Sequence, residues 1–139
     1  MWLLLKRIKG REKVIIPKQA HINDAGYDVY LDEDCKIEHG KNKINLGFKM
    51  KLPAGTCAAI SPRSSFMDVL GNSFVPIDAD YSGVWNFAFN NFGEEIEIKA
   101  GERIGQIVFL PILNPNITDD EEWYNENIRG DGGFGSTGK

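Results

Sequence analysis

The chain has 139 residues, of which 42% are apolar and 26% are charged, and its formal net charge is −4. This length and composition predict a single globular domain. The negative charge argues against a nucleic-acid backbone or an anionic membrane as the main partner.

The chain begins with the apolar run MWLLL, which ends at Lys6 and Arg7. The run is too short to span a membrane, and its charges lie on the wrong side for a signal peptide. The two cysteines, Cys35 and Cys57, form no CxxC pair, which is typical of a chain in the reducing cytoplasm. The two histidines have no cysteine at a ligand-like spacing, so we expect no zinc site.

Alternation of apolar and polar residues predicts that most of the chain is β-strand. In residues 43–53 every second residue is apolar, and the expected buried face consists of Ile44, Leu46, Phe48, Met50 and Leu52. Residues 64–71, SSFMDVLG, form the one helix candidate, because a serine begins the segment and Gly71 can end it.

The β pattern continues beyond this segment. Trp85, Phe87 and Phe89 share one predicted face, and residues 95–112 indicate two strands around a turn at Ala100 and Gly101. Many short strands separated by turn signals favour an all-β sandwich or jelly roll. We therefore divide the chain into a core (residues 1–113), an acidic extended linker (114–128) that lacks alternation, and a glycine-rich C-terminal segment (129–139).

Four internal stretches contain polar residues that the strand pattern does not require. The stretch AGYD (25–28) places a carboxylate after a glycine, and PIDADYSG (76–83) crowds two carboxylates and a tyrosine into a turn. SPRSSF (61–66) places an arginine and hydroxyls where a strand meets the predicted helix, and such helix N-termini bind phosphate well. GERIGQIVF (101–109) contains one uncharged polar side chain, Gln106. Taken singly, each stretch is also explained by an ordinary turn, helix cap or outward-facing residue.

Together with the C-terminal RGDGGFGSTG (129–138), the stretches AGYD, PRSS, IDADYSG and GERIGQIVF resemble the five motifs of the trimeric dUTPase family. The resemblance extends from about residue 23 to the C-terminus, and its final motif is the most specific. It implies a single-domain jelly roll of the β-clip type, with one short helix and an extended C-terminal arm, assembled as a homotrimer with shared active sites. The Arg-Gly-Asp tripeptide at 129–131 is also found in adhesion proteins, which we regard as coincidental here.

The resemblance further implies the hydrolysis of dUTP to dUMP and pyrophosphate with Mg²⁺, which lowers dUTP and supplies dUMP for dTTP synthesis. Asp78 matches the general base that activates the attacking water, and a carboxylate suits that task. Tyr81 matches the ring under the deoxyribose, where it leaves no room for a 2′-hydroxyl. Asp28 matches the acid that holds the metal through water, and Mg²⁺ suits phosphate oxygens, waters and one carboxylate. The phosphate-contacting positions are matched by Arg63, Ser64, Ser65 and Gln106.

In the same family, the backbone of a hairpin reads uracil, which points here to residues between about Asn72 and Asp80, including Ile77. The resemblance also implies that the C-terminal segment is a lid over the active site of a neighbouring subunit. In it, Phe134 would stack on uracil and Arg129 would reach the γ-phosphate. The backbone around Gly135, Ser136 and Thr137 would form a nest for the terminal phosphates.

Two alternatives remain open at this stage. One is a dCTP deaminase, a relative with the same jelly-roll fold whose motif also contains Arg-Ser-Ser. The deaminases lack an IDADY-type turn and a glycine-rich arm with a phenylalanine. The other is a trimer without enzymatic activity that uses the dUTPase scaffold to bind a nucleotide or a protein. Its weakness is that Asp28, Asp78 and Tyr81 are all in place.

Overall fold

The structure is a computed structural model, and it describes residues 1–63, 66 and 74–119. Within these residues the secondary structure consists of strands, without a helix. The strands are β1 (Leu4–Arg7), β2 (Gly26–Tyr30), β3 (Cys35–Ile37), β4 (Gly40–Asn45), β5 (Phe48–Lys51), β6 (Thr56–Pro62), β7 (Val75–Ile77), β8 (Asn86–Asn91), β9 (Ile96–Ile98) and β10 (Arg103–Pro111). The predicted helix at 64–71 lies almost entirely outside the described residues and stays a prediction.

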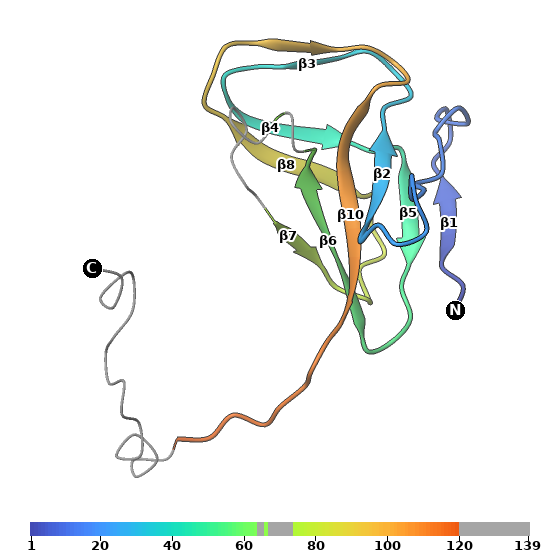
Figure 1. Ribbon diagram of the computed structural model, residues 1–139, viewed down its shortest axis with the longest axis vertical. Coiled ribbons are helices and arrows are strands. Elements are labelled where there is room, and N and C mark those ends of the chain that lie inside the picture. The colour runs from blue at the N-terminus through green and yellow to red at the C-terminus, as the bar shows by residue number, and fades with distance from the viewer. Residues whose placement is uncertain (64–65, 67–73, 120–139) are drawn as a thin grey trace.

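The largest sheet has four strands in the order β2-β10-β6-β7, and every neighbouring pair in it is antiparallel. Three antiparallel ladders, β1-β5, β3-β9 and β4-β8, complete the structure. Figure 1 shows the β4-β8 ladder facing the β2-β10-β6-β7 sheet, with β3 and β9 across one end. The arrangement confirms the predicted all-β, jelly-roll class.

One hydrophobic cluster fills the space between these sheets. Trp85, Phe48 and Phe87 are the largest of its fully buried side chains. The five apolar residues predicted to share a face in 43–53 are all buried, as is the predicted face of β8. The apolar alternation therefore identified the core-facing residues correctly in both stretches.

The stretch 43–53 is, however, not one strand. It divides into β4 and β5 at Gly47, whose φ is +76°. A side chain at this position would also collide with the N-terminal loop, because an ideal Cβ would lie 2.7 Å from Cγ2 of Val14. Glycine is required here both by the left-handed backbone and by the close approach of the loop.

The two strands predicted around Ala100 and Gly101 are present as β9 and β10, but they do not pair with each other. β9 pairs with β3, whereas β10 lies between β2 and β6 in the large sheet. Beyond Pro111, residues 112–119 form no strand and lead away from the core (Figure 1). Most of the predicted linker (114–128) and all of the C-terminal segment (129–139) lie outside the described residues, so this division of the chain stays a prediction.

Candidate active site

A polar row crosses the large sheet near the middle of β2. Antiparallel register places Asp28 of β2 opposite Gln106 of β10, and Gln106 in turn opposite Ser61 of β6. Directly paired residues project from the same face of a sheet, so these three side chains lie side by side. Asp28 and Ser61 are buried, which is unusual for polar residues. The sheet thus brings the stretches AGYD (25–28) and GERIGQIVF (101–109) together, next to Ser61, which directly precedes PRSS (62–65).

The glycine of AGYD makes room for the glutamine of this row. An ideal Cβ on Gly26 would lie 2.2 Å from Oε1 and 2.9 Å from Cδ of Gln106. The carboxamide of Gln106 therefore packs directly over the backbone of Gly26, in space that any other residue would occupy. The first motif positions Gln106 as well as supplying Asp28.

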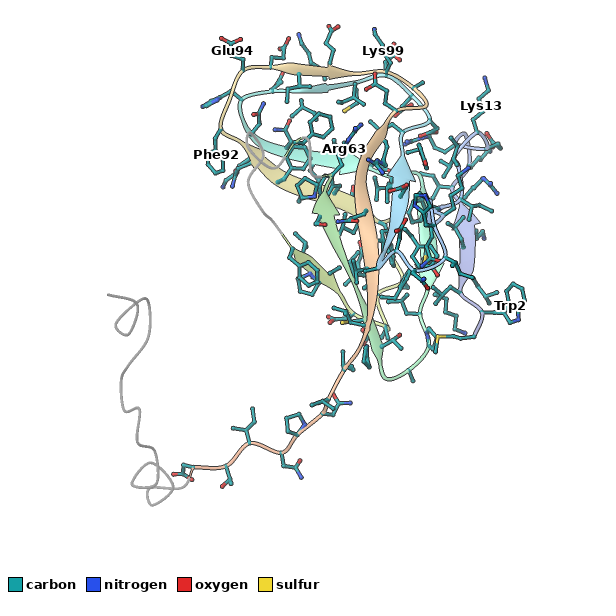
Figure 2. The ribbon with its side chains drawn as sticks, viewed as in Figure 1. Trp2, Lys13, Arg63, Phe92, Glu94 and Lys99 are labelled. Carbon is teal, nitrogen blue, oxygen red and sulfur yellow. The ribbon has the colours of Figure 1, made fainter. Side chains whose placement is uncertain are left out.

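Arg63 follows directly after β6, and Figure 2 shows it at the end of that strand. Its backbone N–H donates to the carbonyl of Ile104 (3.2 Å), and its Nη1 donates to the carbonyl of Arg103 (3.3 Å). The guanidinium lies 5.4 Å from the centre of the Phe66 ring. Among the described residues, none accepts a hydrogen bond from its buried Nε. This side chain is therefore fixed beside the polar row with donor capacity left over.

Asp78 and Tyr81 lie on the turn that joins β7 to β8. Both line a cavity of about 250 Å³, together with Lys43, Pro76, Ile77 and Asn86. The turn is closed by a hydrogen bond from the N–H of Tyr81 to the carbonyl of Asp78 (3.2 Å). The sequence-predicted base, sugar-facing ring and Ile77 therefore meet at one cavity.

The ring of Tyr81 is held in place although it is largely exposed. Its hydroxyl donates to the carbonyl of Val84 (2.9 Å), which also accepts from Nδ2 of Asn86 (2.9 Å). The ring passes over Gly83, where an ideal Cβ would lie 2.5 Å from the tyrosine oxygen. The YSG sequence thus makes a platform in which the glycine lets the ring lie against the backbone.

These two groups of residues lie far apart in one chain. Asp78 directly follows Ile77, which pairs with Ala58, whereas the polar row crosses β6 at Ser61. Asp78 and Asp28 are therefore separated by three strand spacings across the sheet and four residues along it. This corresponds to roughly 20 Å between their backbones. One chain does not bring the two carboxylates together.

Comparison with known proteins identifies the family of this chain. The model of the dUTPase family matches residues 12–138. The chain belongs to the dUTPase family. It is 38% identical over 141 residues to the deoxyuridine 5′-triphosphate nucleotidohydrolase of Crocosphaera subtropica, covering 96% of this chain and 98% of that protein. The corresponding enzyme of Clostridium tetani is 39% identical over 135 residues, with 93% and 92% covered.

Solved structures agree with this assignment. The structure of a mutant dUTPase of Staphylococcus bacteriophage 80alpha with dUpNHpp superposes with a TM-score of 0.85 and 25% identity, covering 98% of both chains. The likeness therefore includes the whole jelly-roll core.

Not all of the dUTPase motifs can be placed. The predicted contacts Ser64, Ser65 and Asn72 lie outside the described residues, and so do all those of the C-terminal motif: Arg129, Phe134, Gly135, Ser136 and Thr137.

Within the described residues, no helix is long and apolar enough to cross a membrane.

Three residues of the site were missed by sequence reasoning. Lys43 and Asn86 line the Asp78 cavity because β4 pairs with β8, and no sequence signal indicated that pairing. Arg103 contacts Asp28 through an ion pair of 3.0 Å between Nη1 and Oδ1. Arg103 lies within the stretch GERIGQIVF, but its distance from Asp28 in the sequence gave no reason to connect the two residues.

The donor set around Asp28 suits a hydrated metal and not a protein cage. Within the described residues, no group of three or more His, Cys, Asp or Glu side chains could hold a metal ion. Oδ1 of Asp28 accepts one hydrogen bond, from Nη1 of Arg103 (3.0 Å), which leaves most of the acceptor sites of the carboxylate available. Mg²⁺ keeps several waters and commonly takes one or two carboxylates plus substrate phosphates, which fits this arrangement.

Proposed function

We propose that this chain is a dUTP diphosphatase, which hydrolyses dUTP to dUMP and pyrophosphate. The observation that carries the proposal is the cavity at the β7-β8 turn, where a carboxylate and an anchored tyrosine ring lie together in a chain of the dUTPase family. The enzyme names of the relatives from Crocosphaera subtropica and Clostridium tetani support the same reaction.

In the proposed mechanism, Asp78 accepts a proton from a water that attacks the α-phosphorus. A bond forms between the water oxygen and this phosphorus, and the bond to the oxygen bridging to the β-phosphorus breaks, which releases pyrophosphate. Tyr81 supports the deoxyribose, and its ring cannot swing away easily because its hydroxyl is bonded to Val84. The uracil would lie near Ile77, which lines the same cavity.

The phosphates would be held by Arg63 and Gln106, with Mg²⁺ held through water by Asp28. The guanidinium of Arg63 supports a role in binding an anion, since it is held at the end of β6 beside the polar row and a guanidinium contacts phosphate with several donors. A bound metal would neutralise phosphate charge, and this chain contributes Asp28 to orient its water shell.

We further propose that a complete site combines residues of neighbouring copies in a homotrimer. The separation of roughly 20 Å between Asp28 and Asp78, estimated from strand spacing, supports this, because one triphosphate cannot bridge it. Residues 129–139 would form the lid, delivered by the linker 114–128, and Phe134 would cover the uracil. The unpaired Cys35 and Cys57 are consistent with a cytoplasmic location.

The reaction is tested by incubating the protein with dUTP and dCTP and measuring pyrophosphate and ammonia. Pyrophosphate from dUTP is the expected result, whereas ammonia from dCTP would indicate a deaminase. Asp78→Asn keeps the shape of the side chain but removes its basicity, so kcat should fall by about 10² to 10⁴ with dUTP binding retained. Glu97→Gln is the matched control, because Glu97 is an exposed carboxylate on β9, a strand that contributes no residue to the Asp78 cavity. Near-normal turnover by Asp78→Asn would exclude Asp78 as the base.

Sharing of the site is tested by complementation. Asp28→Asn and Asp78→Asn should each have little activity. Mixed oligomers formed by refolding the two together would contain some sites with both carboxylates intact, so activity should return. An unmixed blend provides the baseline. Proven mixing of subunits without recovery of activity would show that each chain completes its own site.

A further inference from the structure

A β-bulge brings Arg103 to the polar row. On β10, Arg103 pairs with Tyr30 and Gly105 pairs with Val29, so two steps on β10 match one step on β2. Arg103 and Gln106 are three residues apart and would lie on opposite faces of a regular strand. The extra residue of the bulge places Arg103 on the face that carries Asp28 and Gln106.

From this position Arg103 contacts two residues of the proposed phosphate site. Its guanidinium Nη1 lies 3.0 Å from Oδ1 of Asp28, and its carbonyl accepts the hydrogen bond from Nη1 of Arg63 (3.3 Å). The side chain of Asp28 is 11% exposed, whereas that of Arg103 is 36% exposed. Arg103 therefore approaches Asp28 from the solvent side and fixes the orientation of a mostly buried carboxylate.

The contact restricts how Asp28 can meet a cation. The guanidinium takes one of the roughly four lone-pair sites of the Asp28 carboxylate and thereby fixes the plane in which the other sites point. A carboxylate fixed in this way suits a water bound to a metal, because the orientation of second-shell acceptors controls metal affinity. The nearby positive charge also compensates the buried carboxylate while no ligand is bound.

We propose that Arg103 is a positioning residue for the phosphate end of the site: it orients Asp28 through its side chain and Arg63 through its carbonyl. The inference rests on the proposed function, because it concerns the Mg²⁺-dependent binding of a deoxynucleoside triphosphate. The simpler alternative is an ion pair that only stabilises the fold. The two readings differ in whether loss of Arg103 changes the Mg²⁺ dependence of ligand binding.

The experiment measures binding of dUpNHpp by calorimetry over a series of MgCl₂ concentrations. For Arg103→Met, the Mg²⁺ concentration giving half of the affinity gain should rise by about 10-fold, in the range found for second-shell partners of metals. Arg103→Lys retains the charge and should recover part of this loss. Lys36→Met removes an ion pair of the same 3.0 Å length, between Lys36 and Glu95, and should leave the Mg²⁺ curve unchanged.

A double variant separates positioning from general destabilisation. In the Asp28→Asn background there is no carboxylate to orient, so adding Arg103→Met should change the Mg²⁺ curve by less than about 2-fold. An Mg²⁺ curve of Arg103→Met equal to wild type would overturn the inference, and so would an equal shift with and without Asp28. Thermal unfolding checks each variant, and Arg103→Lys carries the test if Arg103→Met is unfolded. If the wild-type protein neither binds dUpNHpp nor hydrolyses dUTP, the proposed function is wrong and the inference falls with it.

Discussion

Because Gly26 contacts Gln106, we predict that replacing Gly26 reduces activity strongly while changing the stability of the fold only slightly. Gly26→Ala would place a methyl group 2.2 Å from Oε1 and 3.1 Å from Cβ of Gln106. Ordinary contacts between such atoms are longer than 3.4 Å, so the carboxamide must move by more than about 1 Å. The colliding Oε1 and Cδ atoms lie at the far end of a flexible side chain and can rotate away, whereas the 3.1 Å approach to Cβ requires the strands to shift by only a few tenths of an ångström.

The effect on folding should be small. A change of rotamer at Gln106 costs about 0.5–1.5 kcal/mol, and replacing a strand glycine by alanine returns about 0.5–1 kcal/mol through chain entropy. The two terms nearly cancel, so we expect a net change within about 1 kcal/mol and a melting temperature within about 4 °C of wild type. Catalysis should suffer more, because misplacing a substrate-contacting group by 1 Å can reduce kcat/KM by about 10²-fold.

Gly105→Ala is the matched control on the same sheet. There an ideal Cβ would lie 2.5 Å from the carbonyl oxygen of Ser61, a backbone atom of β6 that cannot rotate away. This variant should lose about 1–3 kcal/mol of stability. Thermal unfolding and dUTP kinetics of both variants form the assay. If Gly26→Ala keeps wild-type kcat/KM, the position of Gln106 does not matter for catalysis. If it destabilises the protein as strongly as Gly105→Ala, the glycine serves the fold and not the site.

Two further predictions concern other parts of the structure. Tyr81→Ala should reduce the ratio of kcat/KM for dUTP to that for UTP by about 10-fold or more, whereas Tyr81→Phe keeps the ring and most of the ratio; an unchanged ratio in Tyr81→Ala would remove this ring from the sugar site. Arg11→Met removes the guanidinium that donates to both oxygens of Asp32 (2.6 and 2.7 Å), and should cost about 3 kcal/mol in urea unfolding at pH 7. The same hydrogen bonds lower the pKa of Asp32, so this stabilisation is present at neutral pH and is lost as the pH falls through the lowered pKa. An equal difference between wild type and Arg11→Met at pH 7 and pH 2 would contradict this assignment.

The sequence predicted the core more reliably than the limits of the strands. Alternation identified Trp85, Phe87 and Phe89 as buried because side-chain period depends only on local geometry. The break at Gly47 could not be predicted in the same way. The alternation of apolar residues continues through it, and the reason for the glycine is contact with Val14 of a loop that is distant in sequence.

The sequence predicted which residues form the site, but it did not predict how they are arranged in space. Motif order named Asp28, Gln106 and Asp78, but only strand register shows that Asp28 and Gln106 are neighbours while Asp78 is not. Arg103 was missed for the same reason: its place beside Asp28 depends on a bulge, which moves a residue to the other face of the strand. The contacts of the C-terminal motif stay predictions.

The proposal of a shared site follows from the position of β6, which carries Ser61 of the polar row and also pairs with β7, the strand before Asp78. One end of β6 carries Ser61 and leads into Arg63, while Ala58 near its other end pairs with Ile77, immediately before Asp78. A hydrogen-bonded strand does not shorten, so β6 fixes the spacing between the phosphate-binding row and the base with little tolerance. Under the proposal of a shared site, a ligand that needs both takes one half from a second copy. Under this proposal the same rigidity that preorganises each half makes hydrolysis depend on assembly, because a single chain holds both halves at a distance that no one dUTP can span.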